Sequence, residues 1–167
     1  ALTSFFEVGA EALSFLPDGR YDDPRVTLRL ATEVTGIDPA ARTVTLDDGS
    51  ALAYDELVLA TGAAPFVPPV PGADLDQVFV YRTNEDLEAI REASRGARAG
   101  AVIGGGLLGL EAANALHQLG VTTHVVEMAP RLMAVQVDDA GGATLTRHIE
   151  DLGLRVHTGV VTERITG

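Results

Sequence analysis

The sequence predicts an α/β protein with an antiparallel β meander in its first half and a parallel βαβαβ unit in its second half. In the first half, β-branched runs such as "TEVTGID" and "RTVTLDD" alternate with Asp, Gly and Pro turns. In the second half, apolar strand-like runs alternate with amphipathic helical stretches. Strands that alternate with helices form a parallel sheet with right-handed crossovers.

The composition excludes several classes of function. The chain has 167 residues, no Cys, and a net charge of −12 from 24 acidic and 12 basic residues. This balance argues against nucleic-acid binding, and no apolar run is long enough to span a membrane. Without Cys there is no disulfide, iron–sulfur cluster or redox dithiol, so redox chemistry would require a bound organic cofactor. The first residues do not form a signal peptide, and we expect a cytoplasmic protein.

The first 75 residues predict short helices, the meander and then a connector. The opening "ALTSFFEVGAEALSFLPDGRYDDP" indicates one or two helices with turns at "PDG" and "DDP". The β runs lie within residues 25–38, 42–48 and 52–61, and the last includes an apolar strand at 56–60. Residues 61–75, "TGAAPFVPPVPGADL", are rich in Pro and Gly and predict a connector between two domains. We therefore expect one domain over 1–75 and a second over 76–167.

The second domain begins with a predicted strand at 78–81. Thr83, with Asp86 three residues later, has the form of a capping box and predicts a helix over 84–93. A strand at 99–103 follows, then a helix ended by Gly120, a strand at 121–127, a helix from Asp138 to Gly153, and a strand at 154–161. The last two helices are each expected to bury one apolar side. The residues predicted on those sides are Leu108, Ala112, Ala115, Leu116, Leu119, Leu145, Ile149 and Leu152.

Residues 101–113, "AVIGGGLLGLEAA", have the glycine spacing of a dinucleotide-binding loop. We expect Gly104 to permit the tight turn, Gly106 to let the backbone approach a pyrophosphate, and Gly109 to let the helix pack closely on the strand. The amides of Leu107 and Leu108 would face the phosphates at the positive end of the helix dipole. Because a strand precedes the loop and a helix follows it, a nucleotide site is favoured over a tight turn without a ligand.

An acidic residue completes the pattern. Glu127 ends the next predicted strand, 18 positions after Gly109, close to the expected spacing of about 20. It would accept hydrogen bonds from the adenosine ribose and repel a 2′-phosphate, which favours NAD(H) over NADP(H). Arg131 could in principle neutralise a phosphate, although an Arg in this setting is more often solvated. Glu111 has two open interpretations: an acid favoured by the helix dipole, or a residue close to the cofactor.

No metal site and no catalytic acid or base is expected. Two pairs of Asp residues lie beside Pro or Gly in predicted turns. The four histidines match no short metal-ligand spacing, and each falls on a different predicted element. They are His117, His124, His148 and His157.

Residues 57–72, "LVLATGAAPFVPPVPG", and 101–133, "AVIGGGLLGLEAANALHQLGVTTHVVEMAPRLM", resemble the FAD- and NAD-dependent pyridine nucleotide reductases. This superfamily includes ferredoxin, rubredoxin and nitrite reductases. Two further stretches, "FVYRTNEDLEAIR" and "VVEMAPRLMAVQVDDAGGATL", are most similar to the large subunits of NADH-dependent nitrite reductases. The resemblance spans nearly the whole chain. It implies hydride transfer from NADH to FAD, followed by reduction of nitrite to ammonia at a sirohaem centre outside this chain.

The resemblance also implies an FAD-binding part within residues 1–75. Ala60, Thr61 and Gly62 match the segment that runs close to the flavin nucleotide, and the backbone of Val34 matches the position that meets the adenine. Ser4, in "LTSFF", stands where some relatives carry a Lys near the flavin. A charged contact from this position to the flavin is therefore not expected.

In such proteins an earlier glycine loop opens the FAD domain, and the NAD domain continues beyond "TERITG". No such loop precedes residue 104, so we expect a middle segment of a longer protein, inactive by itself, with sirohaem and iron–sulfur groups outside it. The alternatives are a ferredoxin- or rubredoxin-type reductase, an NADH oxidase, or a nucleotide-binding module without turnover. The expected partners are NADH, the remaining domains of the parent and, at open sheet edges, a second copy in a homodimer.

We expect the purified chain to carry no stoichiometric FAD, because the glycine loop that would anchor this cofactor is not among its residues. The absorbance spectrum after purification measures the flavin content directly. A flavin band at one equivalent that persists through chromatography would contradict the expectation.

Overall fold

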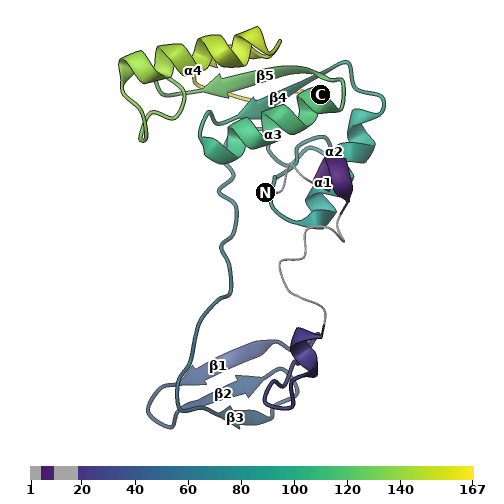
Figure 1. The fold of residues 1–167 in the computed structure, drawn as a ribbon, viewed down its shortest axis with the longest axis vertical. Helices are drawn as coiled ribbons and strands as arrows, with labels where there is room; N and C mark the ends of the chain where they lie inside the picture. The colour runs from purple at the N-terminus through teal and green to yellow at the C-terminus, as the bar shows by residue number, and fades with distance from the viewer. Residues whose placement is uncertain (1–4, 10–18) are drawn as a thin grey trace. The chain divides into compact units, whose positions relative to one another are not determined.

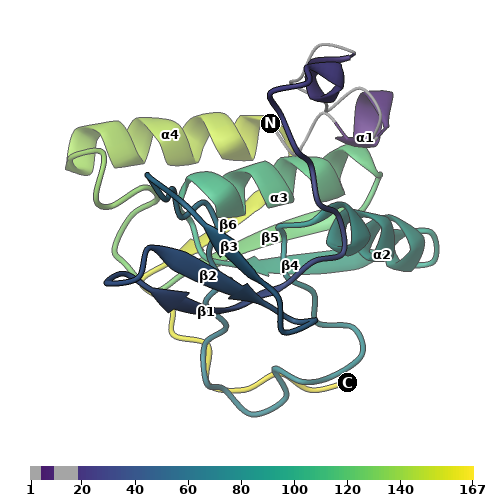
Figure 2. The same ribbon diagram turned by 90° about the horizontal axis from the view of Figure 1, so that it is seen from below.

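The computed structural model describes residues 5–9 and 19–167, which fall into two compact units. The meander unit contains residues 19–64, and the βαβαβ unit contains residues 5–9 and 65–167. Figure 1 labels most of the elements along the chain, and Figure 2 also labels β6. The predicted fold class, a parallel βαβαβ unit preceded by an antiparallel meander, is confirmed.

In the meander unit, a short 3₁₀ helix, η3 (Arg20–Asp22), precedes three antiparallel strands. They are β1 (Val34–Asp38), β2 (Thr43–Leu46) and β3 (Ala51–Ala53), in the order β1-β2-β3. The side chains of Val44 and Leu46 on the central strand are buried. The Asp38 carboxylate accepts hydrogen bonds from the amides of Ala40 and Ala41, both at 2.9 Å, and so closes the β1–β2 turn.

Two predicted strand segments of this unit are wrong. Residues 26–33 and the apolar run at 56–60 do not form strands. Val58 and Leu59, in the second run, are 85% and 67% exposed. A β-branched run becomes a strand only where a neighbouring strand pairs with its backbone and covers a face. Within the described unit, no strand pairs with either run.

The βαβαβ unit has a parallel sheet in the order β4-β5-β6. Its strands are β4 (Ala99–Ile103), β5 (Thr122–Glu127) and β6 (Arg155–Thr158). Helices α3 (Leu107–Gln118) and α4 (Asp139–Asp151) connect them and lie along one face of the sheet (Figure 2). The unit also contains α1 (Phe5–Val8) and α2 (Asn84–Ser94). Among the described residues, no helix is both long and apolar enough to cross a membrane.

The core lies between this face and the two helices. Val102, Val125 and Val156 are aligned across the three strands. They pack with residues from α3, from α4 and from the connecting segments. Those residues are Leu110, Ala113, Leu132, Leu145, Ile149 and Leu154. The alignment places the carboxyl ends of the strands at one edge of the sheet.

The predicted helix boundaries are largely confirmed. Thr83 and Asp86 form the capping box of α2. Gly120 and Gly153 follow α3 and α4 with positive φ angles of 81° and 96°. The residue after each glycine donates its amide to a carbonyl in the last turn of the helix and is buried: Val121 after α3 and Leu154 after α4.

Three predictions for this unit are wrong. Residues 78–81 do not form a strand. Leu108 and Leu152, predicted to face inward, are 52% and 61% exposed. Leu108 lies in the first turn of α3, while Leu152 is the C-cap of α4, and Leu154 takes the buried position instead.

The Pro-rich residues 65–75 belong to the βαβαβ unit. The amide of Ile165 donates to the Pro71 carbonyl at 2.8 Å. A Cβ added to Gly72 would lie 2.1 Å from the Ile165 carbonyl oxygen, so the two segments are in close backbone contact. The predicted domain boundary between residues 75 and 76 stays a prediction.

Candidate functional site

The glycine loop and Glu127 lie at the edge of the sheet where the parallel strands end. Ile103, the last residue of β4, pairs with Val126, and Glu127, the last residue of β5, pairs with Thr158 of β6. The loop of residues 104–106 leaves β4 at this level. Open α/β sheets bind their ligands at the carboxyl ends of the strands, so a ligand-binding site is expected at this edge.

The shape of the loop requires glycine at two of its predicted positions. Gly104 has φ +117°, a conformation that side chains disfavour, and its amide donates to the Val126 carbonyl at 2.8 Å. A Cβ added to Gly109 would lie 1.9 Å from the Gly104 carbonyl oxygen. The first turn of α3 therefore packs directly on the loop backbone, and no side chain fits between them.

Gly106 differs from Gly105 and Gly109 because an added side chain there would face open space. It is the N-cap of α3, has an extended backbone, and a Cβ added there would meet nothing within 4 Å. The first-turn amides, including those of Leu107 and Leu108, have no intrahelical acceptors, and no side chain among the described residues caps the helix. Donors at the positive end of a helix dipole, beside open space, suit a phosphate group. Glu111 is half-buried in the second turn, and both interpretations of it stay predictions.

The Glu127 carboxylate is held by backbone amides on two sides. Its Oε2 accepts a hydrogen bond from the Gly105 amide, and its Oε1 accepts one from the Ala129 amide, both at 2.6 Å. A carboxylate has about four acceptor positions, so two remain for the hydroxyl groups of a ribose. The acid therefore fixes the loop and still presents its charge at the sheet edge.

Gly105 is a constrained position that the sequence analysis missed. A Cβ there would lie 2.6 Å from Leu132 Cδ2 and 3.0 Å from Glu127 Cβ. The Gly105 carbonyl accepts a hydrogen bond from the Met133 amide at 2.9 Å. The dinucleotide pattern leaves this position free, but the middle glycine of "GGG" was a signal that a side chain does not fit there.

Arg131 is neither simply solvated nor free to meet a phosphate. Its Nε donates to the Val137 carbonyl at 2.9 Å and its Nη2 to the Ala134 carbonyl at 3.2 Å. Its Nη1 pairs with Asp139 at 2.7 Å. The guanidinium is thus engaged within the segment that joins β5 to α4.

The residues predicted to contact FAD belong to the meander unit. Val34 opens β1 and is half exposed, and Ala60, Thr61 and Gly62 are exposed in the irregular segment after β3. Ser4 lies outside the described residues. The role of these residues in FAD binding stays a prediction.

The structure pairs two histidines that the sequence analysis treated separately. His124 Nδ1 on β5 and His157 Nε2 on β6 are 2.9 Å apart. The two ring planes are nearly parallel and differ by 9°. The ring centroids lie 5.2 Å apart, a distance that equals the separation of the two nitrogens plus the radius of each ring. The two nitrogens therefore face each other in line, as in a hydrogen bond, rather than converging on a metal ion. Burial, together with the charges of Arg155 and His157, lowers the pKa of His124.

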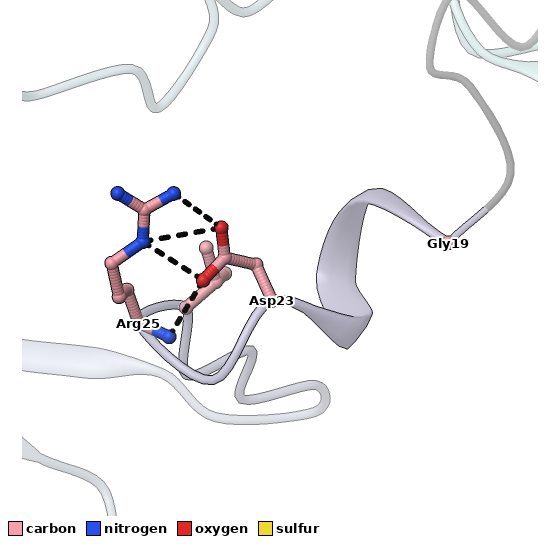
Figure 3. A pocket seen from close by; sticks show the side chains of 4 residues that line it. Gly19, Asp23 and Arg25 are labelled. Atoms are coloured by element: carbon pink, nitrogen blue, oxygen red, sulfur yellow. Dashed lines mark hydrogen bonds and ion pairs between the residues drawn. The ribbon is translucent and has the colours of Figure 1, made fainter.

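A shallow hollow in the meander unit is a weaker candidate for a site (Figure 3). It is lined by Gly19, Asp23, Arg25 and Val26. The Arg25 guanidinium binds both oxygens of the Asp23 carboxylate, with the Nη2 to Oδ2 distance at 2.6 Å, and lowers the pKa of Asp23. The two charges neutralise each other at an exposed position, so the hollow favours no charged ligand.

Known proteins resemble the chain over nearly its whole length. The family model of the pyridine nucleotide-disulphide oxidoreductases matches residues 7–167. The chain is 52% identical to the nitrite reductase (NAD(P)H) large subunit of Klebsiella oxytoca and 45% identical to the nitrite reductase (NADH) large subunit of Escherichia coli K12. Each match covers 98% of this chain but only 17% and 20% of those proteins.

A solved structure shares both the fold and part of the sequence. A ferredoxin reductase of Rhodopseudomonas palustris superposes with a TM-score of 0.89 and 32% identity. The match covers 99% of this chain and 42% of that one.

Gly109→Ala is expected to destabilise the chain by about 1–3 kcal/mol, because the new methyl group would collide with the Gly104 carbonyl. Gly106→Ala is the matched control and is expected to change the free energy of unfolding by less than about 0.5 kcal/mol, since its Cβ meets open space. Chemical denaturation measures both values. Equal stability of the two variants would contradict the tight contact between loop and helix.

The His124–His157 pair predicts a loss of stability in acid. Because the pKa of His124 is lowered on folding, the unfolded chain binds a proton more readily than the folded chain. The free energy of unfolding should therefore fall as the pH drops from about 8 through the ordinary histidine pKa of about 6.5. His124→Ala should reduce this fall, while the exposed His148→Ala on α4 should not. Denaturant titrations at several pH values test the difference, and identical pH profiles for both variants would refute it.

Proposed function

The chain belongs to the pyridine nucleotide-disulphide oxidoreductase family, and on that premise we propose that residues 76–167 bind NADH where β4 and β5 end. One observation carries the proposal: the uncapped N-terminus of α3 faces open space at Gly106, and the Glu127 carboxylate is anchored to the adjacent Gly105 amide at 2.6 Å. These features combine an anion site with an acceptor for a ribose.

The residues at this edge fit a dinucleotide. Gly106 leaves room for a pyrophosphate close to the backbone, and the amides of Leu107 and Leu108 would donate to it. Gly104 and Gly109 give the loop its shape. Glu127 would orient the adenosine ribose with its remaining acceptor positions.

The same residues favour NADH over NADPH. A 2′-phosphate on the ribose would meet the negative charge of Glu127. Arg131, the cation closest in sequence, is committed to Ala134, Val137 and Asp139 and does not offset that charge. The preference for NADH would therefore come from the negative charge of Glu127 and from the engagement of Arg131 by its own loop and by Asp139.

For the whole protein we propose an NADH-dependent flavoprotein that supplies electrons for the reduction of nitrite to ammonia. When bound, NADH and FAD would supply the hydride chemistry, and a sirohaem centre outside this chain would be the site of nitrite reduction. The proposed task of this chain is to bind and orient the nucleotides, with Val34, Ala60, Thr61 and Gly62 contributing to the FAD site. The similarity to two nitrite reductase large subunits over 98% of the chain supports this assignment.

A second candidate is a reductase of ferredoxin-type carriers, which the likeness to the Rhodopseudomonas palustris protein favours. The two candidates predict different parent proteins. A nitrite reductase needs further domains with Cys ligands for a sirohaem and iron–sulfur centre, whereas a carrier reductase needs only the rest of its two nucleotide-binding domains. The sequences on either side of this chain in its gene would decide between them.

NADH is expected to bind to this chain at least roughly tenfold more tightly than NADPH. Gly106→Ala should abolish binding of both nucleotides without unfolding the chain, because its methyl group would occupy the space of the pyrophosphate. Glu127→Gln should reduce the ratio of NADH to NADPH affinity, whereas Glu150→Gln, on the exposed side of α4, should leave it unchanged. Calorimetric titration measures each affinity. Tighter binding of NADPH, or no binding of either nucleotide to the unchanged chain, would overturn the proposal.

A further inference from the structure

The β5–α4 loop, residues 128–138, packs against the glycine loop. The side chain of Leu132 is fully buried and fills the space beside Gly105 where a Cβ would otherwise lie. The amide of Met133 donates to the Gly105 carbonyl at 2.9 Å, and the amide of Ala129 donates to Glu127. The positions of Gly105 and Glu127 therefore depend on the path of the β5–α4 loop.

That path is not one the backbone adopts readily. Met133 has φ +48°, in the left-handed region that residues with a side chain disfavour. The Met133 carbonyl accepts hydrogen bonds from the amides of Gln136 and Val137, at 2.8 and 3.0 Å, so the chain turns back at this point. Such a conformation persists only where surrounding contacts hold it.

Arg131 supplies those contacts from inside the turn. Its guanidinium donates to the carbonyls of Ala134 and Val137 and pairs with Asp139, so it joins the start of the loop to its end and to α4. The Arg131 side chain is 27% exposed, whereas Asp139 is 95% exposed. The two carbonyl bonds are therefore the better shielded part of the network.

The stem of Arg131 is also tightly enclosed. Gly142, in α4, is buried, and a Cβ added there would lie 2.8 Å from both Cβ and Cδ of Arg131. The helix comes this close only because residue 142 has no side chain. The Arg131 side chain is therefore held along its stem by α4 and at its guanidinium group by the hydrogen bonds and the ion pair.

We propose that Arg131 is a positioning residue for the NADH site. It shapes the β5–α4 loop, which in turn holds Gly105 and the Glu127 carboxylate, and it does not itself touch the nucleotide. The part of this inference that concerns NADH rests on the proposed function. The part that concerns Gly105 and Met133 does not.

Two other roles for Arg131 make different predictions. A cation that binds a 2′-phosphate would affect NADPH affinity alone. A residue that only stabilises the fold would lower the free energy of unfolding and would speed exchange of the amides of the core strands as much as those of Gly105 and Met133. A positioning residue changes those two amides and weakens NADH and NADPH binding together.

The test uses the full chain with Arg131→Gln and Arg131→Lys, and with Arg147→Gln on the exposed side of α4 as the control. Amide exchange of Gly105, Met133 and the strand β5 is measured by NMR without nucleotide, and NADH and NADPH affinities are measured by calorimetry. In Arg131→Gln, exchange at Gly105 and Met133 should speed up at least roughly tenfold more than exchange in β5, and both affinities should fall roughly tenfold, because the supporting contacts of the site are lost. Arg131→Lys should recover only part of this effect, since an ammonium group lacks the planar fork that reaches two carbonyls.

Asp139→Asn provides a second test of the inference if the Arg131 variants fail to fold. It removes one exposed partner and leaves both carbonyl bonds, so the same two amides should exchange faster, by less than in Arg131→Gln. Unchanged exchange at Gly105 and Met133 in a folded Arg131 variant, or in Asp139→Asn if the others do not fold, would overturn the inference, as would a loss confined to NADPH. If the unchanged chain binds no nucleotide, the proposed function fails, while the exchange data still decide the role of Arg131.

Discussion

The carboxylate of Glu127 is the group on which the arrangement of the sheet edge depends. A half-buried carboxylate needs hydrogen-bond donors, because burial without them costs free energy. Here the donors are backbone amides of Gly105 and Ala129, which belong to two different connecting segments. Satisfying one charged group therefore fixes the loop after β4 relative to the segment after β5. The contact between Gly109 and the Gly104 carbonyl then sets where α3 begins.

This arrangement links the proposed coenzyme preference to the shape of the loop. To accept a 2′-phosphate, the site would have to lose the charge of Glu127 and gain a cation. Loss of the carboxylate would remove the partner of the Gly105 amide, and recruitment of Arg131 would release Ala134 and Val137. A change of specificity at either position alone would disturb the backbone that we propose binds the pyrophosphate. Compensating substitutions in the β5–α4 loop would be needed as well.

The features that the sequence predicted correctly are those that depend on neighbouring residues. The capping box at Thr83, the glycine after α3 and the strand at 99–103 follow from local pattern and backbone preference. The runs at 56–60 and 78–81 have strand-forming residues, but a strand also needs a partner, which local pattern does not reveal. The same holds at the site: the glycine spacing was visible in the sequence, whereas the contact of Gly105 with Glu127 and the His124–His157 pair come from segments that only the folded chain brings together.

The ends of α3 and α4 limit where the connections of the βαβαβ unit can change in length. The connections from α3 to β5 and from α4 to β6, residues 119–121 and 152–154, are equally short and end on a buried residue. At the opposite edge the connections are unequal, since residues 104–106 follow β4 and residues 128–138 follow β5. One edge of the sheet therefore tolerates little variation in length, because each added residue would displace a core side chain. At the other edge, lengthening a loop would leave the strand alignment intact, so an insertion there would change the site rather than the core.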